Sequence, residues 1–447
     1  MTSHTQRDAG VGSDAAALRA DALDRYRRTR GASDHLARPL SPEDMTVQSM
    51  PDASPAKWHL AHTTWFFETF LLERFDERFE PIEPAFRVLF NSYYNAVGAQ
   101  YPRSSRGVIS RPGADAVRRY RAETDRRVAA LLENLPERHV AAAAEIVELG
   151  IQHEQQHQEL LVTDIKHALS MNPLAPAYRD AGHDSARAAD ELSWLAFDPG
   201  VSELGVDQSA ERFAYDNESP RHRVFLEPFE IAARLLTNAE FAAFIADGGY
   251  ERSELWLDEG WTWVRSEDVS HPLYWRRPDA EGPPGDAASW REFTLAGERP
   301  LDPNEPVCHL SMFEADAAAR WLGARLPTEA EWEHAARSAH PDRVAGYFLE
   351  DERLHPNAAP CETEPTFAQC FGDCWEWTGS QYRPYPGYTP PAGALGEYNG
   401  KFMSNQFVLR GGSCATPRDH VRTTYRNFFP PTARWQFAGV RLARSPR

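Results

Sequence analysis

The sequence predicts a multidomain protein in which a helical domain is followed by an α+β domain. The chain has 447 residues, enough for two or three separate hydrophobic cores. From Ala15 onward the first part carries long amphipathic patterns of helical period, whereas the part after Leu192 is rich in Gly, Pro and Trp and has short apolar runs. Residues 172–192 between them are Pro- and Ala-rich and weakly periodic, as is typical of a domain connection. We therefore place the two domains at residues 15–175 and 190–447.

Four long amphipathic segments account for most of the first domain. We predict helices at residues 15–32, 58–75, 114–135 and 139–169. Long helices joined by loops favour an antiparallel four-helix bundle. One connection, residues 90–107, is unusually long and aromatic (FNSYYNAVGAQYPRSSRG), and ordered loops of this length are often functional.

The second domain mixes short strands with short helices. We predict strands at residues 224–232, 407–412 and 437–443, and helices that end at Gly at residues 237–249 and 312–324. This mixture of short strands and short helices is typical of a loop-rich α+β domain.

Charge and cysteine content exclude several classes of function. The formal net charge of -18 disfavours nucleic acid and anionic membranes as partners. No apolar run reaches the length of about 18 residues that a transmembrane helix needs, and the N-terminus lacks a secretory pattern. The five cysteines form an odd, sparse set, and Cys370 and Cys374 have no second metal-binding pair at finger spacing. We expect free thiols and a cytoplasmic location.

The strongest chemical signal is the segment QHEQQHQE at residues 152–159. On a helix His153 and His157 lie one turn apart on the same face, so both imidazoles can bind one divalent metal. Glu159 lies two residues beyond His157 and is turned well away from that face. We therefore do not expect Glu159 to be a ligand.

The same segment also fits the zinc-protease pattern H-E-x-x-H, in which Glu154 acts as general base. The extended form of that pattern fails, because Leu160 occupies the required Gly position and Thr163 the position of the third His. A glutamate ligand further along the chain stays open, so the protease is a minor alternative.

A third ligand is available in the earlier segment WHLAH, residues 58–62. His59 and His62 are three residues apart, so either one could face the bundle axis. Three histidines with open coordination positions suit catalytic zinc or non-haem iron. The residue types alone leave the choice of metal open.

Both histidine segments, SPAKWHLAHTTWFFE and IQHEQQHQE, resemble the DinB-like four-helix bundle of the sulfoxide synthases of ergothioneine biosynthesis. The resemblance implies that His62, His153 and His157 are the metal ligands. It places His59 at a position where other members accept a residue that is no ligand, which makes it a packing residue or a support for a ligand.

The C-terminal part resembles the formylglycine-generating-enzyme fold, a C-type-lectin-like module, over most of residues 190–447. The resemblance rests on segments 237–250, 305–337, 371–380, 408–415 and 439–444. It implies fold rather than activity, and its tryptophans Trp332, Trp375 and Trp377 are expected to pack in the core. Formylglycine generation is disfavoured, because only Cys414 stands where that activity relies on a cysteine pair.

The combination implies an Fe(II)- and O2-dependent enzyme that joins a thiol to the imidazole of hercynine (trimethylhistidine) and oxidises the sulfur to a sulfoxide. Such chemistry needs a proton or electron donor near the metal, and a tyrosine suits this role. Tyr94, with Tyr93 beside it, resembles the donor pair of one branch of the family. Tyr398 is the alternative counterpart, and loop packing is the alternative role of the pair.

The resemblance also implies the substrate contacts. Gln156 and Asn427 are expected to bind hercynine, with Phe428 against its trimethylammonium group. Arg103 and Arg106 are expected to bind the carboxylate of the thiol, and Arg434 is a further candidate. Relatives that use γ-glutamylcysteine carry an aspartate at the position of Phe429, so cysteine is favoured here.

Several alternatives stay open at this level. A selenium-specific relative would have the same architecture, and an ovothiol-type synthase acts on unmethylated histidine but usually carries an extra methyltransferase domain. A bundle-only zinc thiol transferase does not account for the large second domain. A lectin-like binding module with a structural bundle predicts that the three histidines can be replaced without loss of activity.

Overall fold

The computed structural model describes residues 8–179, 189–207, 213–277, 289–340, 344–360, 366–393, 396 and 399–446. The chain divides into two compact units, Met1–Ala168 and Leu169–Arg447, which are described separately below. Among the described residues, none of the helices combines the length and the apolar character that crossing a bilayer requires.

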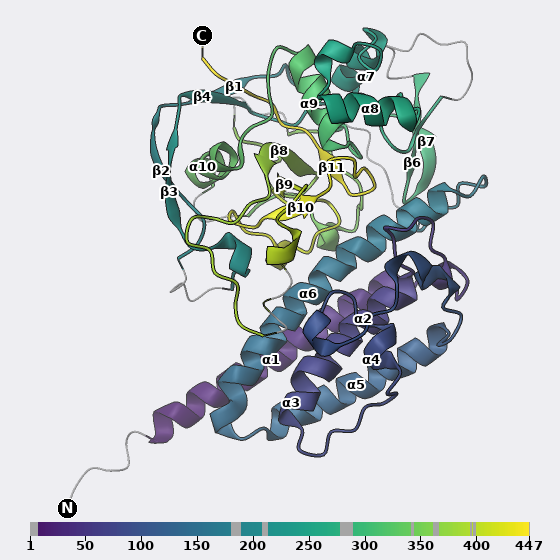
Figure 1. The fold of residues 1–447 in the computed structure, drawn as a ribbon, viewed down its shortest axis with the longest axis vertical. Helices are drawn as coiled ribbons and strands as arrows, with labels where there is room; N and C mark the ends of the chain where they lie inside the picture. The colour runs from purple at the N-terminus through teal and green to yellow at the C-terminus, as the bar shows by residue number, and fades with distance from the viewer. Residues whose placement is uncertain are drawn as a thin grey trace, which may run out of the picture. The chain divides into compact units, whose positions relative to one another are not determined.

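Helices that run alongside one another form the first unit (Figure 1). The long ones are α1 (Asp8–Ala37), α2 (Ala56–Phe67), α5 (Ala114–Asn134) and α6 (Glu137–Ser170). A π turn, η2 (Glu68–Leu72), extends α2 into α3 (Glu73–Phe75), and the short helices are η1 (Asp44–Thr46), α4 (Phe86–Leu89), η3 (Asn95–Val97) and η4 (Arg103–Val108). The predicted helical bundle is confirmed in this unit.

Burial of α2 explains why the bundle closes around this helix. All twelve residues of α2 are buried, including the aromatic run Trp65, Phe66 and Phe67. On α6, Gly150 allows the close approach of the two helices, because a Cβ at this position would stand 2.4 Å from the ring of Phe67. Gly150 precedes His153 by less than one helical turn, so the two helices are pressed together at the level of the predicted ligands.

In the described part of the second unit, short strands form four small sheets, and Figure 1 shows them together with the helices of this unit. One sheet orders β1 (Trp194–Phe197), β4 (Phe229–Ala232) and β12 (Ala443–Arg444), and another pairs β2 (Gly200–Leu204) with β3 (His222–Leu226). A third orders β5 (Trp275–Arg276), β6 (Arg291–Thr294) and β7 (Gly297–Pro300). The fourth orders β10 (Asn427–Phe429), β9 (Phe407–Arg410), β8 (Trp375–Gln381) and β11 (Ala438–Gly439).

Side-chain caps begin three of the α-helices described in this unit. The described helices are α7 (Asn238–Ala246), α8 (Asp258–Ser266), α9 (Met312–Trp321) and α10 (Glu329–Ala339), with short 3-10 turns η5 (Asp216–Glu218), η6 (Ser253–Leu255), η8 (Leu349–Asp351), η10 (Gly400–Phe402) and η11 (Arg418–His420). Thr237, Ser311 and Thr328 each form a capping box with the glutamate three residues later, which satisfies the free N–H groups of α7, α9 and α10.

Core packing explains the tryptophans of the second unit. Trp332, Trp375 and Trp377 are at most 1% exposed. The indole of Trp332 donates to Glu376 and that of Trp377 to the carbonyl of Leu310, so their polar atoms are satisfied. The expectation that they are packing residues is confirmed.

Candidate metal centre

Two adjacent helices of the first unit bring three histidines together. His62 comes from α2, and His153 and His157 come from successive turns of α6. One ring nitrogen from each of the three lies within 4.8 Å of the other two. The structure therefore gathers the three histidines that the resemblance implied as ligands.

The ring of His62 is held by a hydrogen bond to a backbone carbonyl and by two aromatic neighbours. The Nδ1 atom lies 2.6 Å from the carbonyl oxygen of Phe90, so Nδ1 carries the proton and donates. The ring is stacked between Trp58 and Trp65, with interplanar angles of 13° and 14°. This arrangement leaves the lone pair on Nε2, which lies 3.2 Å from Nε2 of His153.

Burial keeps all three rings neutral. It lowers the pKa of His62 and His157 well below the ordinary value, and repulsion from neighbouring histidines adds to the effect. Burial also lowers the pKa of His153 to about 4, against the opposing charge of Glu154. Metal binding requires neutral histidine, so the site holds its ligands in the reactive form near neutral pH.

The arrangement fits a divalent metal ion. Nitrogen atoms of neutral rings converge in a buried place, and a cation is the partner that such lone pairs accept. Nδ1 of His153 is buried without a hydrogen-bond partner, so no described protein group competes for this ring. Three imidazoles with further positions left for substrates suit a catalytic metal of the first transition row or zinc.

The depressed histidine pKa values predict a pH-dependent stability of the metal-free protein. An unfolded histidine titrates near pH 6.5 and His153 at about 4, so the unfolded chain binds more protons between these values. The free energy of unfolding should fall as the pH is lowered from 6.5 to 4, by about 3 kcal/mol for His153 alone. Urea unfolding followed by circular dichroism at each pH measures this. The His153→Asn protein should show a smaller fall, and a profile identical to wild type would contradict the assignment.

Glu154 points away from the metal centre, into a buried ion-pair network. Its carboxylate accepts from Arg30 at 2.9 Å, from Arg121 at 2.7 Å and from Ser33 at 2.6 Å. Burial alone would raise the pKa of Glu154, but Arg121 and Arg30 outweigh it and lower the pKa to about 2. A carboxylate held this way is a poor proton acceptor near neutral pH. The zinc-protease alternative, which needs Glu154 as general base, is therefore wrong for this chain.

The loop at residues 90–107 lies beside the metal centre and carries the predicted tyrosines. The ring of Tyr94 lies 5.7 Å from that of Trp65 and 6.3 Å from that of Phe66, measured between centroids. Those two rings in turn contact His62 and His153. Tyr94 is thus buried and packs against the two aromatic residues that contact the rings of His62 and His153.

Two arginines hold this loop in place. Arg103 donates to the hydroxyl of Tyr93 at 3.0 Å and to the carbonyl of Asp52. Arg106 is 3% exposed, donates to the hydroxyls of Ser54 and Ser92, and lies over the ring of Trp58 at 3.3 Å. Burial lowers the pKa of Arg106 to about 9. Its partners are uncharged, so among the described residues its charge is not neutralised by an ion pair.

Comparison with known proteins agrees with this geometry. The DinB superfamily model matches residues 25–161, and the model of the sulfatase-modifying factor enzyme 1-like domain matches residues 183–446. The hercynine oxygenase of Mycolicibacterium thermoresistibile is 34% identical over 90% of this chain and 89% of its own length. That of Mycobacterium tuberculosis is 33% identical over 90% of this chain and 93% of its own.

This chain belongs to the hercynine oxygenase family. Its N-terminal domain is DinB-like and its C-terminal domain is related to the formylglycine-generating enzymes, as the fold prediction stated. The formylglycine-generating enzyme of Streptomyces coelicolor is 31% identical over 48% of the chain and 76% of its own length.

The other residues of this hercynine oxygenase family member that are predicted to contact hercynine lie in both units. Gln156 is half-buried on α6, directly before His157. Asn427 opens β10 in the second unit, where its side-chain oxygen accepts from the backbone N–H of Phe428 at 2.9 Å. The ring of Phe428 is stacked on that of Tyr382, 4.1 Å between centroids and 10° between planes.

Two weaker candidates have other partners, and a third is not described. Arg434 forms an ion pair with Glu314 at 3.1 Å and donates to the carbonyl of His271, so its guanidinium is already engaged. Phe429 packs edge-on against Trp435. Tyr398 lies outside the described residues. The described cysteines, Cys308, Cys370, Cys374 and Cys414, are buried and form no disulfide with one another, as expected, and Cys361 is not described.

A second group of potential ligands lies in the second unit. One oxygen or nitrogen from each of Glu292, Glu305 and His355 lies within 4.8 Å of the others. The guanidinium of Arg299 contacts all three: Nη2 lies 2.7 Å from the Glu292 carboxylate and 2.6 Å from Nε2 of His355, and it also pairs with Glu305. An arginine already supplies the positive charge here, so this group is a buried ion-pair cluster.

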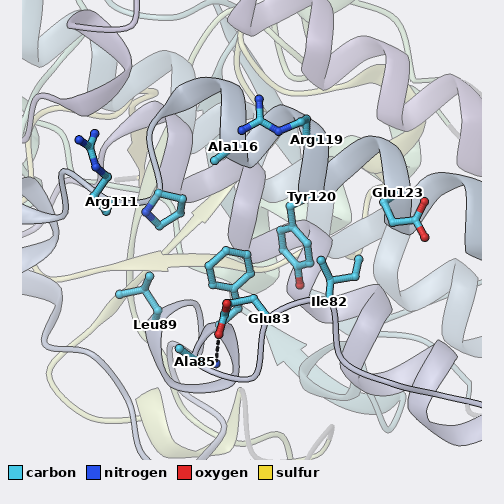
Figure 2. A pocket seen from close by; sticks show the side chains of 11 residues that line it. Ile82, Glu83, Ala85, Leu89, Arg111, Ala116, Arg119, Tyr120 and Glu123 are labelled. Carbon is cyan, nitrogen blue, oxygen red and sulfur yellow. Dashed lines mark hydrogen bonds between the residues drawn. The ribbon is translucent and has the colours of Figure 1, made fainter.

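An open pocket of about 730 Å³ lies on the first unit (Figure 2). It is lined by residues of α4, α5 and the segments beside them: Ile82, Glu83, Ala85, Phe86, Leu89, Arg111, Pro112, Ala116, Arg119, Tyr120 and Glu123. None of the three metal-site histidines lines it. Its hydroxyl-bearing residue, Tyr120, donates to the buried Glu68. We therefore assign the chemistry to the histidine centre.

Sequence reasoning missed the groups that support the ligands. Arg30, Arg121 and Ser33 anchor the α6 segment through Glu154, although nothing in their spacing connects them to the HEQQH segment. Asp164 also lies close to the centre, seven residues after His157. Residues seven apart on a helix are separated by two turns and lie on one face. The spacing of His157 and Asp164 could therefore have identified Asp164 from the sequence.

Proposed function

We propose that the protein is a non-haem Fe(II)- and O2-dependent sulfoxide synthase. It joins hercynine to a thiol, with cysteine favoured over γ-glutamylcysteine, in ergothioneine biosynthesis. The observation that carries the proposal is the convergence of three neutral histidines, the buried His62 and His153 and the partly buried His157, in a chain of the hercynine oxygenase family. The relatives' name supports hercynine as substrate over unmethylated histidine.

The overall reaction balances without an external reductant. The imidazole loses one C–H hydrogen and the thiol loses its S–H hydrogen, while one C–S bond forms. One oxygen atom of O2 goes to the sulfur as the sulfoxide, and the other leaves as water with the two hydrogens. Fe(II), when bound by the three histidines, supplies the open coordination positions and the redox activity that this oxidation needs.

The residues of the chain then bind and orient the two organic substrates. Gln156 and Asn427 are proposed to hydrogen-bond hercynine, and Phe428 to lie against its trimethylammonium group. Arg103 and Arg106 are proposed to bind the thiol carboxylate. The uncompensated charge of Arg106 supports this role, because a buried guanidinium is stabilised by an anionic partner. Holding both substrates in place replaces a multimolecular encounter with a local one.

Tyr94 is proposed as the proton or electron donor, with Tyr93 beside it. The Tyr94→Phe substitution keeps the ring packing against Trp65 and Phe70 but removes the hydroxyl. We expect the rate of sulfoxide formation to fall by about 100-fold or more, as general acid catalysis of this kind contributes. The amount of bound iron should stay at the wild-type level. Tyr101→Phe, on the same loop, is the control and should keep the wild-type rate. An equal rate in Tyr94→Phe and wild type would assign Tyr94 to loop packing.

The function itself is tested with the full chain. The protein is purified without oxygen, loaded with Fe(II) and given hercynine and O2, with cysteine or γ-glutamylcysteine in separate reactions. Mass spectrometry should find the sulfoxide of the cysteine adduct in excess over that of the γ-glutamyl adduct. Absence of product with both thiols, at full iron occupancy, would overturn the proposal.

A further inference from the structure

Two buried polar side chains, His59 and Asp164, form a line of hydrogen bonds that ends at the ring of His157. Nδ1 of His59 lies 2.8 Å from Nδ1 of His157, and Nε2 of His59 lies 3.0 Å from Oδ2 of Asp164. His59 is 3% and Asp164 5% exposed, so water does not replace these contacts. His59 comes from α2, whereas His157 and Asp164 both come from α6.

Hydrogen bonds from the backbone fix the far end of this chain. The backbone N–H of Ser54 donates to Oδ2 of Asp164 at 2.7 Å. The hydroxyl of the same serine accepts from Arg106 at 2.8 Å. Asp164 is therefore held by the segment that enters α2, and its orientation does not depend on the metal.

The direction of each hydrogen bond follows from the donors available. A carboxylate oxygen only accepts, so Nε2 of His59 carries a proton and donates to Asp164. A neutral His59 ring then has its lone pair on Nδ1, where it accepts from Nδ1–H of His157. This leaves His157 with a lone pair on Nε2. Binding of a metal through Nε2 of His157 also requires the proton on Nδ1. The hydrogen bonds that lead to Asp164 and the metal therefore favour the same tautomer of His157.

Only His157 among the three ligands has side-chain support of this kind in the described part of the chain. His62 donates to the backbone carbonyl of Phe90, a partner that no substitution of Phe90 removes. Nδ1 of His153 has no hydrogen-bond partner. Among the described residues, the hydrogen bond at Nδ1 of His157 is thus the one of the three that depends on the identity of another side chain.

We propose that His59, oriented by Asp164, is a positioning residue that fixes the tautomer and the ring orientation of His157 for metal binding. The inference rests on the proposed metal centre and extends it by one layer. Partners of this kind behind a ligating histidine raise its basicity, and their loss weakens metal binding by about 10–100-fold. His59 is then neither a ligand nor a mere packing residue.

The test uses the full-length protein loaded with Co(II), which reports metal binding without any turnover. Competition with a chromophoric chelator measures the dissociation constant of Co(II). Proton NMR of the paramagnetic protein detects the exchangeable ring N–H of each coordinated histidine. The variants are His59→Phe, which keeps a ring but removes the acceptor, and His59→Gln, whose side-chain oxygen can accept from His157. His139→Phe is the matched control, because His139 lies early on α6 and packs against Phe75.

We expect His59→Phe to weaken Co(II) binding by about 10–100-fold and to expose the ring N–H of His157 to rapid solvent exchange. His59→Gln should restore most of the affinity and the slow exchange, which a purely structural role of the ring would not predict. His139→Phe should match wild type. Co(II) binding and N–H exchange in His59→Phe equal to those of wild type would overturn the inference while leaving the metal centre intact.

Asp164→Ala provides a second route if circular dichroism shows that His59→Phe does not fold. His59 then keeps its position, but nothing fixes its tautomer, so Co(II) binding should again weaken. Wild-type affinity in a folded Asp164→Ala protein would also overturn the inference. Failure of the wild-type protein to bind Co(II) would overturn the proposed metal centre itself, and the two failures are thereby distinguished.

Discussion

Replacing His153 with alanine is expected to remove the bound metal and to reduce sulfoxide formation by about a thousand-fold or more. Two histidines remain, and a catalytic metal that contributes several kcal/mol to the transition state is lost from the site. His153 is the most informative of the three ligands because its Nδ1 atom has no hydrogen-bond partner among the described residues. Its removal therefore breaks no protein hydrogen bond at that atom, and the fold should persist.

Three measurements on the purified variant check this expectation: metal per chain by elemental analysis, sulfoxide by mass spectrometry, and helicity by circular dichroism. His139→Ala, on the same helix but outside the centre, serves as the control and should retain metal and activity. Stoichiometric iron together with full activity in His153→Ala would exclude the three-histidine centre.

Replacing Glu154 with glutamine is expected to destabilise the helical unit rather than to alter the chemistry directly. The substitution removes the negative charge that pairs with both Arg30 and Arg121. The side chain of Glu154 is 1% exposed, so water cannot replace these ion pairs. Breaking a buried ion pair in this way costs about 3–5 kcal/mol. We expect the lower end, because Arg30 also pairs with Asp125 and Arg121 with Asp34.

Urea unfolding followed by circular dichroism measures this effect, and hydrogen exchange of the α6 amides locates it. The control is Glu148→Gln, six residues earlier on the same helix, which removes a partly exposed pair with Arg25 and should cost less than about 1 kcal/mol. Equal stability of Glu154→Gln and Glu148→Gln would contradict the buried network.

The Glu154 effect should also depend on pH with a definite sign. Its folded pKa of about 2 lies below the ordinary value, so its stabilisation is complete above about pH 4.5 and is lost as the pH falls towards 2. The difference in unfolding free energy between wild type and Glu154→Gln should shrink over that range. The histidine contribution described above is lost at higher pH, between 6.5 and 4, and the two effects are therefore separable.

Much of the fold was predictable because it depends on local patterns. Helical periodicity located the long helices of the first unit, since an amphipathic segment can bury only one face. The aromatic loop between the second and third long helices was also recognised from its length and composition. The boundaries were less certain; α1 begins at Asp8 rather than Ala15, and the segment predicted as one helix at residues 58–75 contains a π turn at Glu68–Leu72.

The sequence by itself determined which residues can bind a metal. The spacing of His153 and His157 places them on one helical face whatever surrounds the helix. It left open whether His59 or His62 completes the site, because residues three apart on one helix can both face the axis. The choice follows from the rotation of α2 against α6, which is a property of side-chain packing between helices distant in sequence.

The tertiary structure decided the roles of the polar residues around the histidines. Glu154 fits the protease pattern by spacing, yet Arg30 from α1 and Arg121 from α5 turn it into a structural anion. His59 has the same side chain as the ligands, yet Asp164 and His157 engage both of its ring nitrogens. Proton position and charge depend on partners that the fold brings within 3 Å, and for this reason only the folded chain separates ligand, support and anchor.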